Sequence, residues 1–298
     1  MKFSCTPISF HSSIRQGEMD LRGFFRFCAE QGLEGVDILD TEGYPWLWSE
    51  SDSLEKCVRW ANEDGLMIAA YACGNNFAKA EAEARAEQVA LVIRAIERAA
   101  RCGAPLLRIF GGHHAQAGGE ASIETASGLE MIIHGVAQCL PHAERAKVIL
   151  ALENHGRLPG HSYEQAAVLD HFRSPWLKAL YDPANYIGNN MGEDEDPLRA
   201  FDCLRREIIH THLKDVGPPV RDLKRRREPY VAGQGITPLR QIIAAMVKSG
   251  YKGFCALEYE ASQTTPEREG VPASLDFLKK CREAALLQIR PSEEVAIR

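Results

Sequence analysis

The sequence predicts an α/β protein, a single-domain (β/α)8 TIM barrel, and three observations support that fold class. The chain has 298 residues, 45% of them hydrophobic and 26% charged, and a barrel commonly uses about 250 residues as one unit. Short apolar runs alternate with longer amphipathic stretches at a spacing of roughly 35 residues. Eight of each are present, which favours closure into a barrel over an open doubly wound sheet, the alternative.

The predicted strands are apolar runs of about four to eight residues, the length of a buried parallel strand. Gly65, Pro105 and Gly253 are turn residues that come before or at the start of three of them. In chain order the predicted strands cover residues 3–10, 35–39, 66–73, 106–110, 148–152, 177–181, 208–213 and 253–257.

The predicted helices are the amphipathic stretches between these runs. Gly32 and Gly103 follow two of them as C-caps, and Pro197 and Pro238 occupy first turns. In chain order they cover residues 21–31, 54–64, 79–102, 123–145, 163–171, 197–206, 238–248 and 274–287. We therefore expect one barrel over residues 1–290 and a charged, fraying tail over residues 291–298.

The composition, net charge and local sequence motifs exclude several classes of protein. The net charge of −6 argues against a generally basic nucleic-acid-binding surface, and no apolar run is long enough to cross a membrane. Residues 9–13 after the first strand do not form the glycine-rich loop of a dinucleotide-binding fold. The nine cysteines form no CxxC pair, which indicates reduced thiols. Because the N-terminus turns polar too early for a signal peptide, we expect a cytoplasmic protein.

Acidic and imidazole side chains stand at the ends of the last four predicted strands. They are Glu153, Asp182, His212 and Glu258. Active sites of parallel barrels lie at this end of the strands. Three crowded carboxylates would repel one another unless a cation neutralised them, so the pattern indicates one divalent metal ion. Mixed oxygen and imidazole ligands suit Mn²⁺ or Mg²⁺, with Co²⁺ and Zn²⁺ as alternatives. The competing interpretation is that each acid separately caps the helix that follows it.

Four strings that contain these residues resemble the xylose-isomerase-like TIM barrel superfamily. Its sugar and sugar-phosphate isomerases and epimerases, such as the tagatose/psicose 3-epimerases and inositol-catabolic enzymes, are the closer relatives. The strings are ALENHG at 151–156, YDPAN at 181–185, HTHLKD at 210–215 and ALE at 256–258. The resemblance extends from residue 32 to residue 258.

The resemblance implies a metal-dependent enzyme. In that family the four matching residues bind one divalent ion, and the two glutamates, here Glu153 and Glu258, act as acid and base. A keto sugar, sugar phosphate or polyol would lose a carbon-bound proton to give a cis-enediolate. Proton return to the opposite face gives epimerisation, and return to the neighbouring carbon gives isomerisation. Loss of a β-hydroxyl from the same intermediate gives dehydration.

Two departures from the family pattern concern substrate binding. Asn185 stands where the epimerases have a histidine, and Pro218 stands where the ketose epimerases have an arginine, for which Arg221 is a loose substitute. The related endonucleases hold three metals with additional histidine and aspartate residues that this sequence lacks. We therefore do not expect activity on abasic DNA or a nucleic-acid partner.

Further polar residues are expected near the same mouth. The candidate substrate contacts are His113, His155, Asn185, Lys214 and Arg221. For His113 the alternative is a polar loop, and for Lys214 it is a structural ion pair. The basic run 221–227 is an anion-binding lid, a nucleic-acid contact or a solvated loop.

The leading functional prediction is a divalent-metal-dependent sugar isomerase or epimerase with a small-molecule sugar or polyol substrate. A metal-dependent dehydratase or lyase that uses the same intermediate is the second. A non-catalytic sugar- or phosphate-binding barrel is the third, and the retention of both Glu153 and Glu258 argues against it. Barrels of this kind often pair through outer helices, so a homo-oligomer is compatible with the sequence.

Overall fold

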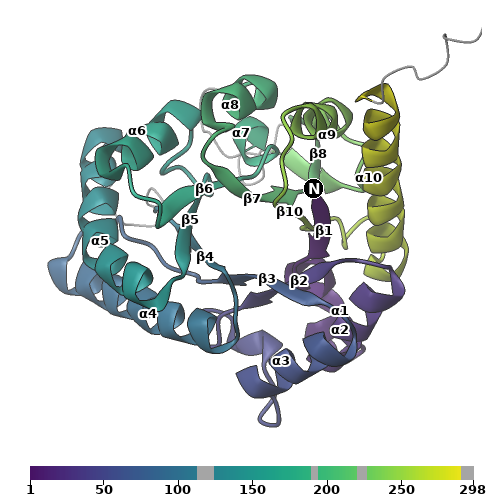
Figure 1. Ribbon diagram of the computed structural model, residues 1–298, viewed down its shortest axis with the longest axis horizontal. Coiled ribbons are helices and arrows are strands. Elements are labelled where there is room, and N and C mark those ends of the chain that lie inside the picture. Colours follow the sequence, from purple (N-terminus) through teal and green to yellow (C-terminus); the bar gives the residue numbers. More distant parts are fainter. Residues whose placement is uncertain (113–123, 189–193, 220–226, 290–298) are drawn as a thin grey trace, which may run out of the picture.

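The computed structural model describes residues 1–112, 124–188, 194–219 and 227–289, and in them it confirms the predicted barrel (Figure 1). The predicted tail at 291–298 lies outside the described residues. Eight parallel strands form the barrel sheet. They are β1 (Lys2–Cys5), β2 (Gly35–Leu39), β3 (Met67–Ala72), β4 (Leu106–Phe110), β5 (Ile149–Glu153), β6 (Leu177–Tyr181), β7 (Ile208–Leu213) and β10 (Phe254–Leu257).

The strand order closes the sheet nearly into a ring. Hydrogen-bonded neighbours follow the order β1-β10-β7-β6-β5-β4-β3-β2, and all these pairs are parallel. The two end strands, β1 and β2, meet where the backbone N–H of Glu34 donates to the carbonyl of Phe3 at 3.0 Å. All eight carboxyl ends therefore open on one mouth, as the sequence predicts.

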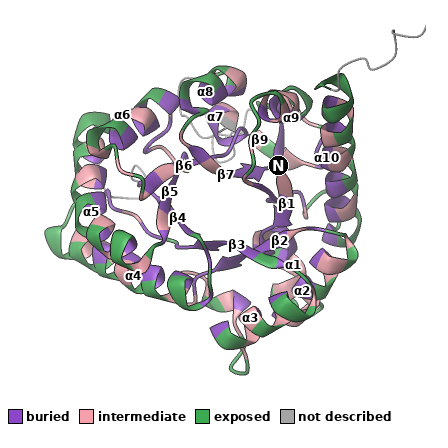
Figure 2. Ribbon diagram, in the orientation of Figure 1, coloured by how far each residue is buried: buried purple, intermediate pink, exposed green. Residues whose placement is uncertain are grey.

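Helices surround the strands and turn their buried sides toward them (Figure 2). Side-chain oxygens cap several of them: Asp20 accepts from the N–H of Gly23, and Ser53 from that of Lys56. The described helices are α1 (His11–Arg15), α2 (Leu21–Glu30), α3 (Leu54–Glu63), α4 (Ala82–Arg101), α5 (Thr125–Ala146), α6 (Ser162–Phe172), α7 (Asn185–Gly188), α8 (Pro197–Leu204), α9 (Leu239–Lys248) and α10 (Glu267–Ile289). None of the helices described is long and apolar enough to span a bilayer.

Two predicted boundaries were wrong, and one pair of strands was not predicted. The first strand ends at Cys5, because Pro7 begins a short 3-10 helix (Pro7–Phe10) that Thr6 caps. The last helix begins at Glu267, ahead of Pro272, because the Pro266 carbonyl accepts from two following N–H groups. The segment after β7 contains the antiparallel pair β8 (Asp215–Pro219) and β9 (Arg227–Tyr230), which was not among the predicted strands.

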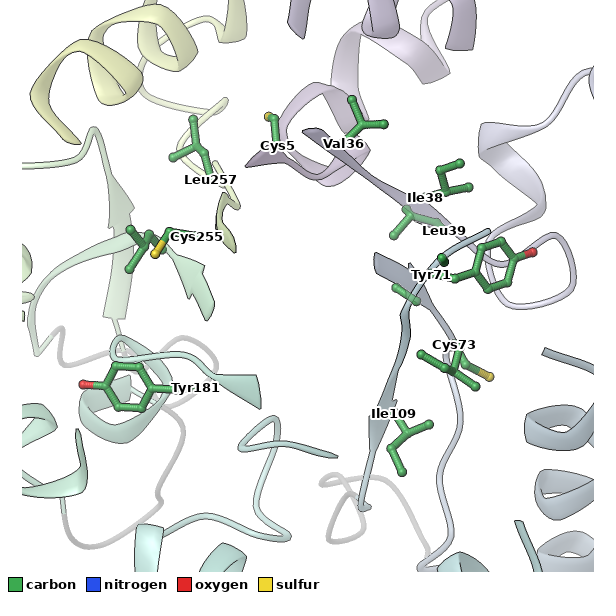
Figure 3. Packing of buried hydrophobic residues seen from close by; sticks show 14 of the residues in the cluster. Cys5, Val36, Ile38, Leu39, Tyr71, Cys73, Ile109, Tyr181, Cys255 and Leu257 are labelled. Atoms are coloured by element: carbon green, nitrogen blue, oxygen red, sulfur yellow. The ribbon is translucent and has the colours of Figure 1, made fainter. Parts of the chain in front are cut away.

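The two faces of each strand carry different residues, because successive side chains of a strand point to opposite sides. Ile38, Ile109 and Tyr181 point away from the centre of the barrel, toward the helices (Figure 3). The inner face has a small apolar cluster of its own, formed by Ala70, Leu106, Ala151 and Leu180. The inner face also carries charged residues, and those near the carboxyl ends of the strands, such as Glu153, belong to the site at the mouth.

Candidate metal centre

The structure brings the four predicted ligand residues together. Glu153 is the last residue of β5 and His212 lies in β7, while Asp182 and Glu258 directly follow β6 and β10. One potential ligand atom from each lies within 4.8 Å of the others, and all four residues are buried. Side chains from four separate strands thus converge on a space that one ion can fill.

Contacts with an imidazole ring, backbone N–H groups and an amide side chain fix the orientation of the acidic side chains. The Nδ1 atom of His212 lies 3.4 Å from Glu153 Oε1 and 3.7 Å from Glu258 Oε1. The Oδ1 atom of Asp182 accepts from the backbone N–H of Ala184 at 2.9 Å. The Asn154 side chain bridges β5 and β6, since it donates to the Asp182 carbonyl and accepts from its N–H.

Two buried cations accompany the carboxylates. The Nζ atom of Lys214 lies 3.1 Å from Asp182 Oδ2 and 2.7 Å from Glu258 Oε2. The Nε atom of Arg108 lies 3.4 Å from Glu153 Oε2. Each glutamate therefore directs one oxygen toward His212 and the other toward a buried cation. This cation is Arg108 for Glu153 and Lys214 for Glu258.

Charge crowding perturbs the acids unequally. Burial by itself raises the pKa of Glu153, but His212 and Arg108 outweigh it and lower that pKa. Burial likewise opposes ionisation of Glu258, and Lys214 lowers its pKa overall. For Asp182, burial together with the two glutamates outweighs Lys214 and raises the pKa to about 7. For His212, burial opposes protonation, but the glutamates raise its pKa well above the usual value.

The donor set fits a divalent cation. Asp182 Oδ2 and His212 Nδ1 are buried and make no hydrogen bond, although both lie close to groups of opposite charge. Buried polar atoms without a hydrogen bond are rare in folded proteins and often mark a place for an ion. Three carboxylates and one imidazole nitrogen are ligands that Mn²⁺, Mg²⁺, Co²⁺ and Zn²⁺ accept.

Comparison with known proteins identifies the family of the barrel. The family model described as the xylose isomerase-like TIM barrel matches residues 25–281. The chain belongs to this family. No curated protein matches it.

Solved structures with the same fold include an epimerase, a zinc-binding protein and a probable dehydratase. L-ribulose 3-epimerase has 15% identity and a TM-score of 0.76, with 99% of each chain covered. The IolI protein with a bound zinc atom has 13% identity and a TM-score of 0.74, covering 97% of this chain and 99% of that one. The probable 3-DHS dehydratase AsbF from Bacillus anthracis has 18% identity and a TM-score of 0.72, covering 94% and 99%. The TM-scores and coverage show a shared fold, and at these low identities the similarity shows the fold alone.

Three of the predicted substrate contacts lie at the mouth of this xylose isomerase-like barrel. Asn185 Nδ2 lies 3.4 Å from Glu153 Oε1, and Lys214 touches two of the acids. His155 stacks on the ring of Phe110, with 4.1 Å between ring centroids. Two others, His113 and Arg221, lie outside the described residues.

The described end of the basic run makes an internal contact. Arg227 pairs with Asp194 and donates from Nε to the carbonyl of Ile187 at 2.7 Å. This residue therefore ties β9 to the segment after β6. The rest of the run, 221–226, is outside the described residues, and its proposed role as a lid stays a prediction.

Sequence reasoning missed four residues around the centre. They are Asp37, Arg108, Asn154 and Glu260, whose Oε2 atom lies 3.7 Å from Lys214 Nζ. Asp37 and Arg108 each interrupt a run of apolar residues in a strand that is buried on both sides. A charge at such a position is itself a signal, because an isolated buried charge is strongly destabilising.

Proposed function

We propose that this protein is a divalent-metal-dependent epimerase or isomerase of a keto sugar, sugar phosphate or related polyol. One observation carries the proposal: two buried glutamates from separate strands, Glu153 and Glu258, both lie near Nδ1 of His212 within reach of one ion. A pair of carboxylates around one bound substrate carbon can remove a proton and return another.

The glutamates divide the acid–base work. One takes the proton from the carbon beside the substrate carbonyl, which leaves a cis-enediolate. The other must begin in its protonated form, and it gives that proton to the opposite face of the same carbon in epimerisation or to the neighbouring carbon in isomerisation. The two carboxyl groups exchange protonation states in the process, so proton balance is kept. Arg108 and Lys214 hold one oxygen of each glutamate and so keep the other in place.

Glu153, Asp182, His212 and Glu258 would hold the divalent ion, with Mn²⁺ or Mg²⁺ as the leading candidates and Co²⁺ or Zn²⁺ as alternatives. When bound, the ion supplies Lewis-acid stabilisation of negative charge on the substrate oxygens. His155, Asn185 and Lys214 are the described residues proposed to contact substrate hydroxyl groups. His113 and Arg221 are proposed for the same role.

Dehydration through the same enediolate is the second candidate. The buried ammonium of Lys214, 2.7 Å from Glu258, favours it, because a fixed positive charge can stabilise the negative charge that develops on a departing hydroxyl group. Similarity in fold to a probable dehydratase is compatible with this reaction.

Isotope exchange tests the proposal. The protein is incubated with Mn²⁺ and a panel of keto sugars in D₂O, and deuterium incorporation at carbon is followed by NMR. We expect exchange with at least one sugar, and loss of exchange by about a thousandfold or more in Glu153→Gln and Glu258→Gln. Glu42→Gln is the matched control, because Glu42 pairs with Arg94 and Arg98 on the outer side of the barrel.

The products separate the two reactions. An epimer or isomer supports the leading candidate, whereas release of water and a new conjugated carbonyl absorbance supports dehydration. If Glu153→Gln and Glu258→Gln exchange as fast as the unmodified protein, the assignment of acid and base is wrong.

A further inference from the structure

A polar layer lies in the barrel interior next to the metal centre, in a place where barrels are normally packed with apolar residues. Its central member is Asp37, in the middle of β2, with 1% of its surface exposed. Val36 and Ile38 on either side point toward the helices, so Asp37 faces the lumen. There it reaches across β1 and β10 to the side chains of β7 (Figure 3 shows the outward-facing neighbours).

Three potential donors surround the Asp37 carboxylate. Ser4 Oγ donates to Oδ1 at 3.0 Å. The other oxygen, Oδ2, lies 2.8 Å from His210 Nε2 and 3.6 Å from His212 Nε2. An ionised carboxylate can only accept, so the hydrogen in the short contact belongs to His210 Nε2. The Asp37 carboxylate thus lies next to one hydroxyl from β1 and two imidazole rings from β7.

The two edges of the His212 ring face different surroundings. Nε2 faces Asp37, whereas Nδ1 faces Glu153 and Glu258 and makes no hydrogen bond. A hydrogen on Nε2 leaves the lone pair on Nδ1, and a lone pair is what a metal ion requires of a histidine. The nitrogen opposite the metal normally donates to a carboxylate or carbonyl, which fixes both the tautomer and the ring orientation.

We propose that Asp37 is the positioning residue for His212: it holds the ring so that Nδ1 is the nitrogen that binds the divalent ion. His210 and Ser4 support this role by holding the carboxylate itself in place. This inference rests on the proposed metal centre and adds a residue that touches neither the ion nor the substrate.

The alternative is that Asp37 only fills space and pairs with His210. An apolar side chain would fill the same space without a buried charge, as it does in the neighbouring cluster of Ala70, Leu106, Ala151 and Leu180. The alternative also predicts no link between Asp37 and metal binding, and this makes the two interpretations separable.

The test compares Asp37→Asn with the unmodified protein after removal of metal. Calorimetric titration with Mn²⁺ and Zn²⁺ gives affinity and stoichiometry, and ¹⁵N NMR of the histidine rings reports which nitrogen carries hydrogen and which binds Zn²⁺. We expect one ion per chain in both proteins, with affinity weakened by about 10- to 100-fold in Asp37→Asn. In the unmodified protein we expect the Zn²⁺-induced shift at Nδ1 of His212.

Asp40→Asn is the matched control. Asp40 is also buried and directly follows the same strand, but it pairs with Arg98 on the helix side. Equal weakening in both variants would overturn the positioning role, as would an affinity in Asp37→Asn within twofold of the unmodified protein. Binding of Zn²⁺ through Nε2 of His212 would overturn it without any variant. If the unmodified protein bound no ion, the metal centre itself would fall, which is a distinct result.

Discussion

The outward and inward faces of the same strands solve opposite problems. Tyr181 and Asp182 are consecutive residues, both buried. The Tyr181 side chain packs between the sheet and the helices and donates from its hydroxyl to the Pro197 carbonyl at 2.7 Å. Asp182 points the other way and lies close to Glu153, His212 and Glu258, so that three carboxylates crowd around one imidazole. The comparison teaches that the outer layer stabilises the barrel, while the mouth holds crowded carboxylates whose mutual repulsion opposes folding.

Substitutions at these two consecutive residues test the comparison of the two faces with the largest expected effects. Asp182→Asn should weaken divalent-ion binding by more than about 100-fold, because it removes one of four ligands. It should not lower the free energy of unfolding of the metal-free protein, since it relieves repulsion among crowded carboxylates. Tyr181→Ala should lower that free energy by about 3–5 kcal/mol, because it leaves a cavity in the core.

Denaturant unfolding and calorimetric titration on the metal-free proteins measure both quantities. Tyr181→Phe, which keeps the ring and loses only the hydrogen bond, is the control for the cavity. If Asp182→Asn destabilises the metal-free protein as much as Tyr181→Ala does, the proposed division between the two faces is wrong.

Sequence reasoning reached the four candidate ligands because they stand at positions that a run of apolar residues defines. Glu153, Asp182 and Glu258 each come where such a run stops, so the barrel fold alone places them at one mouth. Asp37 and Arg108 interrupt their runs, and their partners come from other strands; His210 lies 173 residues from Asp37. Such contacts depend on which strands face each other across the lumen, and no local sequence pattern indicates which strands these are.

For the fold, too, the sequence predicted the barrel but not every strand. Element alternation gave the barrel, since each strand and helix has its own apolar period. The pair β8 and β9 was missed because Pro218, Pro219 and Pro229 stand within these short strands, and proline is a poor strand former.

Two lysines provide a second test, which compares a buried ion pair with one near the surface. Lys214 is buried between Asp182 and Glu258, whereas Lys178 pairs with Glu207 at 2.6 Å near the surface. In the metal-free protein, Lys214→Met should cost about 3–5 kcal/mol of unfolding free energy, because it leaves buried carboxylates without a cation. Lys178→Met should cost about 1 kcal/mol or less.

Added Mn²⁺ makes this test specific. Saturating ion should recover part of the loss in Lys214→Met, since it supplies positive charge at the same place, and should not alter the loss in Lys178→Met. Thermal unfolding with and without Mn²⁺ measures both effects. Equal costs for the two lysines would contradict the electrostatic account of the mouth.

The central claim is that Glu153, Asp182, His212 and Glu258 hold one divalent ion together. The most direct measurement is the anomalous X-ray difference density of crystals soaked in Mn²⁺. The account predicts a single strong peak per chain, bonded to one oxygen from each acid and to Nδ1 of His212. A strong peak elsewhere, or soaked crystals with no peak among these four side chains, would contradict it.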